Sequence, residues 1–315
     1  MGLDEKQILE LRSAKTPRDP WKHLGIVHEQ ETDARGKLVE TSTVFLVGSE
    51  CPFRCLMCDL WQYTLDQPTP SDALPKQLSE ALQQIPHRQT IKLYNASNFF
   101  DRRSVPTEDL PKLAELCRDF ERVIVENHPR LVSQKIVEFQ SQINGQLEIA
   151  MGLETADPQI LAGLNKRMTR ESFATATAQL HSWGIQTRAF AIFQLPGVSP
   201  EAACDDAQNT VRFAYDCGID VCTLIPLRPG NGAVDHLIQQ NAATLPTLAD
   251  YRAAAENCLK IAQRSNRVLL VDLWDMDQFQ HCPDCLPHQL KILTAINQQQ
   301  TRLALSFCPT CQSDR

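Results

Sequence analysis

The sequence predicts an α/β protein, a partial (β/α)6 barrel of the TIM type with a small cysteine-rich, metal-binding lobe at its C-terminus. Short apolar runs alternate with stretches of helical periodicity from residue 42 to about 275, which implies parallel strands covered by helices. Polar residues directly follow most of these runs, and such a distribution favours a barrel mouth over an open sheet with one switch point. Two Cys-x2-Cys pairs follow the last run.

The predicted strands are near-continuous apolar runs, as expected of parallel strands that are buried on both faces. In chain order they are TVFLVG (43–48), TIKLYN (90–95), RVIVEN (122–127), LEIAMGLE (147–154), TRAFAIFQL (187–195), VCTLIPL (221–227) and VLLVDLW (268–274). The stretches between them have apolar residues at helical spacing. They predict helices over 75–85, 107–120, 133–143, 169–184, 200–218 and 248–264.

Three segments follow from these patterns. Residues 1–41 form an N-terminal extension, which we expect to be a helix and a polar approach segment packed on the barrel. Residues 42–275 form the barrel, and residues 276–315 form the cysteine-rich tail. Within the tail, the helical pattern of residues 289–300 predicts a helix that packs the metal-binding lobe on the barrel.

The composition is that of an ordinary soluble protein, with 43% hydrophobic and 22% charged residues. No apolar run approaches the ~18 residues of a membrane span, and the first residues lack a signal-peptide core. We therefore expect a cytoplasmic protein with reduced thiols and no membrane partner. The net charge of −7 gives no reason to expect DNA binding. Of the 12 cysteines, those in tight clusters are better metal ligands than disulfide partners.

The first cluster has the spacing Cys51-x3-Cys55-x2-Cys58, directly after the first predicted strand. A 4Fe–4S cluster normally takes four thiolates, so three leave one iron open to a substrate or cofactor. A zinc site is the alternative, with His87 or His128 as the fourth ligand. The remaining alternative is that the three thiols are grouped by chance and bind no metal.

These cysteines and four further stretches resemble the radical S-adenosylmethionine (SAM) enzymes, in their elongator-catalytic-subunit and archaeosine-synthase-like branch. The stretches are IKLYNASNFFD, VIVENHPRLV, MGLETADPQILAGLNKRMT and the run from Gly184 to Gly197, so the resemblance covers about residues 42–275. It implies a barrel of six β/α units with a 4Fe–4S cluster on Cys51, Cys55 and Cys58. It also implies SAM at the open iron, reductive cleavage to a 5′-deoxyadenosyl radical, and a reducing partner such as flavodoxin or ferredoxin.

The resemblance also implies a set of SAM-binding residues around the mouth. They are Met57, Asn95, Ser97, Glu126, Arg130, Glu154 and Gln194. Met57 departs from the family pattern, which is often aromatic at that position. Local chemistry offers other roles: Glu154 as a cap of the helix that begins near Asp157, and Asn95 as a turn residue.

The turn RPGNG after the sixth strand places two polar residues at the predicted mouth. Arg228 and Asn231 are therefore candidates for holding a carboxylate or phosphate of the substrate. For Arg228, pairing with an acidic side chain is the alternative.

The second cluster lies in the tail, where HCPDC and CPTC place Cys282, Cys285, Cys308 and Cys311 in two pairs. Four thiolates make a closed metal site. Zinc and an auxiliary 4Fe–4S cluster are the two main alternatives, with redox-active thiols as a third. His281 and His288 are spare ligands.

The function predicted from the sequence is a radical SAM enzyme of unassigned reaction, acting on a small molecule or on RNA. Within this class, a tRNA- or nucleobase-modifying enzyme, a small-molecule oxidoreductase, mutase or methylating enzyme, and a sulfur-inserting enzyme remain open. The alternative outside the class is a non-catalytic scaffold that binds iron–sulfur and zinc.

Overall fold

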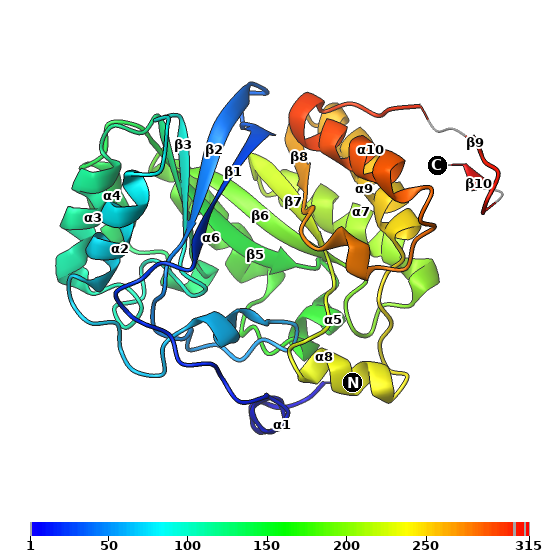
Figure 1. Cartoon of the computed structure of the whole chain (residues 1–315), viewed down its shortest axis with the longest axis horizontal. Coiled ribbons are helices and arrows are strands. Elements are labelled where there is room, and N and C mark those ends of the chain that lie inside the picture. Colours follow the sequence, from blue (N-terminus) through cyan, green and yellow to red (C-terminus); the bar gives the residue numbers. More distant parts are fainter. Residues whose placement is uncertain (1, 305–306, 312, 315) are drawn as a thin grey trace.

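One sheet of eight strands, in the order β1 to β8 along the chain, forms the centre of the molecule (Figure 1). The computed structural model describes residues 2–304, 307–311 and 313–314. Strand β1 pairs antiparallel with β2, and all later pairs are parallel. The strands are β1 (Gly25–Thr32), β2 (Leu38–Phe45), β3 (Thr90–Tyr94), β4 (Arg122–Glu126), β5 (Gln146–Glu154), β6 (Gln186–Phe193), β7 (Val221–Pro226) and β8 (Val268–Val271).

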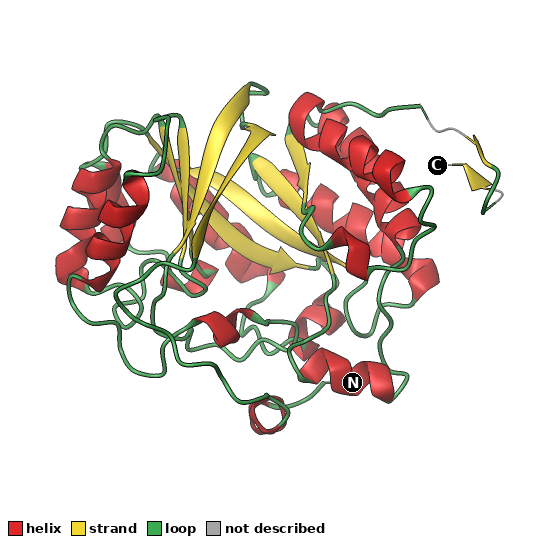
Figure 2. Cartoon of the chain, in the orientation of Figure 1, coloured by secondary structure: helices red, strands yellow, loops and turns green. Residues whose placement is uncertain are grey.

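A helix follows each of the strands β2 to β7 and lies on the outside of the curved sheet (Figure 2). These helices are α2 (Ala73–Leu82), α3 (Leu110–Cys117), α4 (Gln134–Gln140), α6 (Arg170–Ser182), α7 (Pro200–Asp216) and α9 (Leu248–Arg264). The prediction of a partial barrel with six β/α units is therefore confirmed. Local sequence defines the helix starts: in α7 the Ser199 hydroxyl accepts from the backbone N–H of Ala202, and Pro200 occupies the first turn.

Three short helices lie beyond the carboxyl ends of the strands, on the lower side of Figure 1. They are α1 (Glu5–Glu10), α5 (Pro158–Gly163) and α8 (Ala233–Gln239). After β8 the chain forms α10 (Leu286–Gln299), which confirms the helix expected over 289–300. The tail ends in the short strands β9 (Phe307–Cys308) and β10 (Ser313–Asp314). None of the described helices is long and apolar enough to cross a membrane.

Strand β1 is the main departure from the expected secondary structure, because residues 25–32 lie in the segment predicted to be an irregular approach. The turn after β1 has the chemistry of a hairpin. The Asp33 side chain accepts from the backbone N–H groups of Arg35 and Lys37, and Gly36 has φ 78°. Apolar periodicity does not predict β1, because this strand turns the acidic side chain of Glu31 inward.

Those acidic side chains belong to a buried network that fills the barrel interior at the amino ends of the strands. Arg188 on β6 bonds Glu31 at 2.9 Å and Glu148 on β5 at 2.6 Å. Lys92 on β3 bonds Glu31 at 2.6 Å, so cations of two strands share one carboxylate of the hairpin. We call this set the lumen ion network. Its members are Glu31, Asp33, Lys92, Arg122, Glu148 and Arg188, all of them buried.

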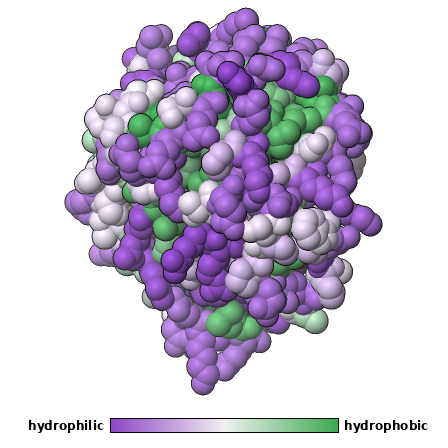
Figure 3. Space-filling view, turned by 90° about the vertical axis from the view of Figure 1, so that its left-hand side faces the viewer, coloured by the Kyte–Doolittle hydropathy of each residue, from purple (hydrophilic) through white to green (hydrophobic). Residues whose placement is uncertain are grey.

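The apolar core lies mainly between the sheet and its outer helices. A second, smaller core joins α1 and α8 to Leu56 in the cysteine loop, so the N-terminal helix packs at the barrel mouth. The face over α2, α3 and α4 is mostly hydrophilic, with smaller hydrophobic areas (Figure 3).

The lumen ion network predicts a loss of stability in acid. Burial alone raises the pKa of Glu31, but the charges of Arg188 and Lys92 outweigh it and lower that pKa to about 2. Because the pKa is lower in the folded than in the unfolded chain, the ionised Glu31 contributes stability above about pH 4.5 and loses it as the pH falls toward 2. Glu31→Gln should therefore be less stable than wild type near neutral pH, with the gap shrinking by pH 3. Urea unfolding across this range measures it, and a gap that is independent of pH contradicts the prediction.

Candidate functional site

The three clustered cysteines lie in the loop that follows β2, at the carboxyl end of the barrel. Cys51, Cys55 and Cys58 are all half-buried free thiols. The loop is held from two sides. The backbone N–H of Leu56 donates to the carbonyl of Leu164 at 2.9 Å, and the side-chain amide of Asn231 donates to the carbonyl of Leu56 at 2.8 Å. The loop is therefore fixed against the segments that follow α5 and β7.

The N-terminal extension also holds this loop. Glu50, which directly precedes Cys51, pairs with Arg12 at 2.7 Å and with Arg54 at 3.2 Å. The Arg12 guanidinium also lies 4.6 Å from the ring centroid of Trp61, which follows the three cysteines in the sequence. Arg12 in the N-terminal extension thus contacts residues before and after the cysteines and holds their loop in place. Sequence patterns did not predict this support.

Asn98 contacts the first cysteine directly, although sequence reasoning assigned it no role. Its amide nitrogen donates to the Cys51 sulfur at 3.1 Å, while its amide oxygen accepts from the backbone N–H of His128 at 2.8 Å. Hydrogen bonds of this kind stabilise a thiolate and tune a metal that it binds. The sequence signal for Asn98 was its position three residues after Asn95, in a polar stretch at the end of a predicted strand.

Neither histidine proposed as a fourth zinc ligand is placed for that role. The His128 ring stacks on Phe53, and its nitrogens are both engaged, Nε2 with the carbonyl of Lys166 at 2.9 Å and Nδ1 with the backbone N–H of Arg130 at 3.1 Å. His87 precedes β3 at the opposite end of the barrel and bonds the Ser42 hydroxyl at 2.9 Å. Neither His87 nor His128 therefore supplies the fourth ligand that a zinc ion on the N-terminal cysteines needs.

A buried ion pair lies beside the cysteines. Lys166 donates to Glu154, the last residue of β5, at 2.7 Å, and both side chains are buried. Glu154 has φ 68°, a left-handed backbone that costs energy in a non-glycine residue and is typical of functional sites. Gly152 leaves the room for this pair, because a Cβ there would lie 2.1 Å from a Glu154 carboxylate oxygen. The helix cap suggested for Glu154 is instead Asp157, which accepts from the backbone N–H groups of Gln159 and Ile160.

Lys166 places a positive charge beside the cysteines. Sequence reasoning missed this residue. Burial raises the pKa of the Cys55 thiol to about 11 and also raises that of Cys51, while the positive Lys166 opposes both shifts. Burial likewise raises the pKa of Glu126, the last residue of β4, to about 8; Lys166 opposes this shift and Glu154 adds to it. Burial therefore raises the pKa of the thiols and of Glu126, and the Lys166 charge opposes these shifts.

Two expected SAM-binding residues follow β3. Asn95 is fully buried, and its amide donates to the Ser104 hydroxyl at 2.8 Å. Its Oδ1 and the hydroxyl of Ser97 are buried without a hydrogen-bond partner among the described residues, which is costly for a polar atom. Ala96 between them has φ 53°. Gln194, directly after β6, has φ 62° and is tied through its amide to Thr244 at 2.9 Å.

The remaining predicted residues are dispersed. Met57 is half-buried between the two cores, and Arg130 is exposed. Asn231 is buried against the cysteine loop, and Arg228 pairs with Asp272 at 3.1 Å, which is the alternative role expected for it. The structure thus brings the cysteines, Glu126 and Glu154 together and gives Asn231 and Arg228 protein partners.

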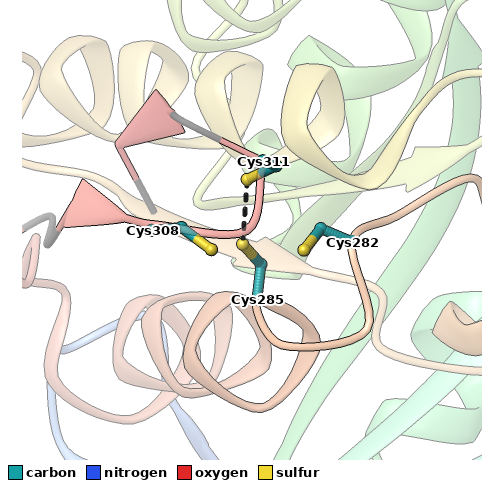
Figure 4. Close-up of side chains that lie close together, drawn as sticks. All are labelled: Cys282, Cys285, Cys308 and Cys311. Atoms are coloured by element: carbon teal, nitrogen blue, oxygen red, sulfur yellow. Dashed lines mark hydrogen bonds between the residues drawn. The ribbon is translucent and has the colours of Figure 1, made fainter.

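The four tail cysteines converge from two segments, with their sulfur atoms pointing toward a common centre (Figure 4). Cys282 and Cys285 lie at the start of α10, and Cys308 and Cys311 lie in the β9–β10 hairpin. The four sulfur atoms lie within 4.8 Å of one another. Backbone N–H groups, chiefly that of Cys311, lower the pKa of Cys308 to about 6. The tail is therefore a site that can hold a metal ion.

Asn98 gives a direct test of how the cysteine loop is supported. Asn98→Ala removes the donor to Cys51 and leaves the buried N–H of His128 without its acceptor, which costs about 1 to 3 kcal/mol. We expect a lower melting temperature and a lower iron content after anaerobic reconstitution. Asn209→Ala, on the exposed side of α7, is the control, because its amide bonds only Arg212 among the described contacts. Unchanged iron binding in Asn98→Ala contradicts the assignment.

The sequence matches no protein-family model and no curated protein. Among solved structures, it is similar to the radical SAM methyltransferase TsrM from Kitasatospora setae (TM-score 0.46, 15% identity, 61% of this chain and 39% of that one). It is also similar to Elp3 from Methanocaldococcus infernus (0.48, 13%, 64% and 51%) and to the radical SAM enzyme HemN from Escherichia coli (0.47, 14%, 71% and 52%). The match spans about half or less of each of these proteins.

Proposed function

We propose that this chain is a radical SAM enzyme, with a 4Fe–4S cluster on Cys51, Cys55 and Cys58. The observation that carries the proposal is the arrangement at the barrel mouth. Three half-buried thiols lie beside a buried lysine, and the two histidines that could have been a fourth ligand are engaged elsewhere. Three thiolates to which neither His87 nor His128 adds a fourth ligand suit a cluster that keeps one iron for a small molecule.

The chemistry of the surroundings fits a cluster. Burial raises the pKa of all three thiols, and a bound metal would favour their deprotonation. Lys166 supplies a positive charge close to Cys51 and Cys55, and Asn98 supplies a hydrogen bond to the Cys51 sulfur. Both stabilise negative charge on the sulfur ligands.

The expected SAM-binding residues present polar groups that suit the two ends of that molecule. The unpartnered oxygens of Asn95 and Ser97 follow β3, and Glu154 and Glu126 end the neighbouring strands β5 and β4. Carboxylates and amide oxygens accept from amino and ribose hydroxyl groups. In the proposal, Glu154 orients the ligand while Lys166 holds its carboxylate in place. Burial raises the pKa of Glu126 to about 8, which favours its protonated form as a hydrogen-bond donor.

When bound at Cys51, Cys55 and Cys58, the cluster with SAM would supply one-electron chemistry that generates a 5′-deoxyadenosyl radical, which would take a hydrogen atom from a small-molecule or RNA substrate. The barrel residues position SAM and keep water from the mouth. In the proposal, a flavodoxin or ferredoxin supplies the electron.

The test uses the full chain, purified without oxygen and reconstituted with iron and sulfide. We expect 5′-deoxyadenosine and methionine in equal amounts after addition of SAM with dithionite or reduced flavodoxin. We also expect SAM to change the electron paramagnetic resonance spectrum of the reduced cluster before turnover. A fully loaded cluster whose spectrum is unchanged by SAM, and which gives no 5′-deoxyadenosine, would support the non-catalytic scaffold instead.

A further inference from the structure

We propose that the tail holds a single zinc ion, bound by Cys282, Cys285, Cys308 and Cys311, which fastens the C-terminal hairpin to α10 and keeps α10 on the open edge of the barrel. The inference concerns a different site from the one proposed for SAM chemistry and does not depend on it.

The spacing of the sulfur atoms distinguishes the two metals. Four thiolates around one zinc ion, at about 2.3 Å each, lie about 3.8 Å from one another at tetrahedral angles. In a 4Fe–4S cluster each thiolate binds a different iron at a different corner, so the sulfur ligands are spread apart, on the order of 6 Å. The tail sulfur atoms all lie within 4.8 Å, and those of Cys285 and Cys311 are 3.5 Å apart. This spacing is that of a single ion and too small for a cubane.

The tail site has two arms, residues 282–285 and residues 308–311. Side chains other than the cysteines also join these arms. The hydroxyl of Thr310, between the last two cysteines, donates to the carboxylate of Asp284, between the first two. Within the first arm, the backbone N–H of Cys285 donates to the carbonyl of Cys282 at 3.0 Å, so the turn that spaces these thiols continues into α10. With four protein ligands, such a site leaves no position for a substrate, and its role is structural.

Helix α10 covers the edge strand β8, and the ion supports this role. Strand β8 ends the sheet, so among the described residues no strand is hydrogen-bonded to the outer side of its backbone. Asn297 donates to the carbonyl of Val271 at 2.8 Å and accepts from its N–H at 2.7 Å. Gln300, one turn later, donates to the carbonyl of Leu269 at 2.7 Å and accepts from its N–H at 2.9 Å. Two side-chain amides therefore satisfy the edge groups that a further strand would bond, which removes a template for aggregation.

The thiol pairs flank this helix, with Cys285 directly before its first residue and Cys308 after its end. A metal ion that links them closes a loop around α10 and restricts its movement away from β8. We infer that loss of the ion frees the helix and exposes the edge amides of Leu269 and Val271, while interior strands keep their protection.

Metal content decides the identity of the ion. The full chain is produced in medium that contains iron and zinc, purified without oxygen, and measured by elemental analysis. The triple variant Cys51→Ala/Cys55→Ala/Cys58→Ala, which keeps the tail, should retain about one zinc per chain and show no iron–sulfur absorption. Iron and sulfide in this variant, or no metal at all, overturns the proposal. Cobalt(II) added after zinc removal should give the visible spectrum of a tetrahedral thiolate site.

A second measurement tests the role of the ion. Cys282→Ser/Cys308→Ser should lose the zinc, and hydrogen exchange at the amides of Leu269 and Val271 should rise by at least tenfold relative to that at Val125 in the interior strand β4. Asn297→Ala, which leaves the thiols in place, should keep the zinc and raise exchange at Val271. Cys217→Ser, outside the tail, should change neither. Zinc loss without faster exchange at Leu269 and Val271 refutes the clamp, and the metal content of the triple variant stands even where the double variant folds poorly.

Discussion

Cys55→Ala is expected to abolish the release of 5′-deoxyadenosine from SAM. Cys55 lies at the barrel mouth between the other two clustered cysteines, and Lys166 acts on its charge. Loss of one of three ligands leaves two, too few to hold a cluster with a single open iron. The fall should exceed the 10- to 100-fold typical of changes to supporting residues, so we expect at least about 100-fold. Liquid chromatography of single-turnover mixtures, with iron measured on the same sample, checks it.

Cys217→Ala is the matched control for this prediction. Cys217 is also half-buried and free, but it caps the end of α7, outside the mouth. It should keep its iron and release 5′-deoxyadenosine at the wild-type rate. If Cys55→Ala retained both the spectrum of the cluster and wild-type release, the assignment of this residue as a ligand would be wrong.

Arg188→Leu is expected to cause a large loss of stability. The buried guanidinium bonds Glu31 at 2.9 Å and Glu148 at 2.6 Å, and its removal leaves both carboxylates in the barrel interior without their main cation. Breaking a buried ion pair on one side typically costs about 3 to 5 kcal/mol. Denaturant unfolding at pH 7 should show a loss of that order in the free energy of unfolding.

Arg118→Leu is the control, since Arg118 makes an exposed pair with Glu115 at 3.5 Å. Its loss should cost no more than about 1 kcal/mol. The Arg188→Leu defect should also shrink in acid, where protonation removes the charge left on Glu31. A cost below about 1 kcal/mol at pH 7 contradicts the view that the lumen ion network is one electrostatic unit.

The two predictions concern opposite ends of the same barrel. At the amino ends of the strands, opposite charges pair in the buried interior and link β1 to β3 and β6. At the carboxyl ends, burial raises the pKa of Glu126 and of the Cys55 thiol beside the Lys166–Glu154 ion pair. One end therefore contributes stability and the other keeps polar groups available for chemistry.

The sequence alone determined the succession of strands β2 to β8 with their helices, and the tail cysteines that converge in space. Apolar runs of strand length and helices of regular period are local patterns, and burial on both faces makes them readable. The spacing of Cys51, Cys55 and Cys58 and of the paired tail cysteines is likewise local, because a metal site needs thiols on one short turn. The roles predicted for the residues that bind SAM remain predictions.

Only the tertiary structure decided which distant polar side chains meet. Glu31 and Arg188 are 157 positions apart, and β1 looks like an irregular polar segment until its acids find their partners inside the barrel. Lys166, in a loop between two left-handed residues, is indistinguishable in sequence from a solvated lysine. Asn297 and Gln300 look like ordinary polar helix positions until they meet the edge of β8. The partners of charged and amide side chains are set by which residues lie close in the folded structure. Apolar periodicity depends only on residues that are near in sequence, so it alone can be recognised from a local segment.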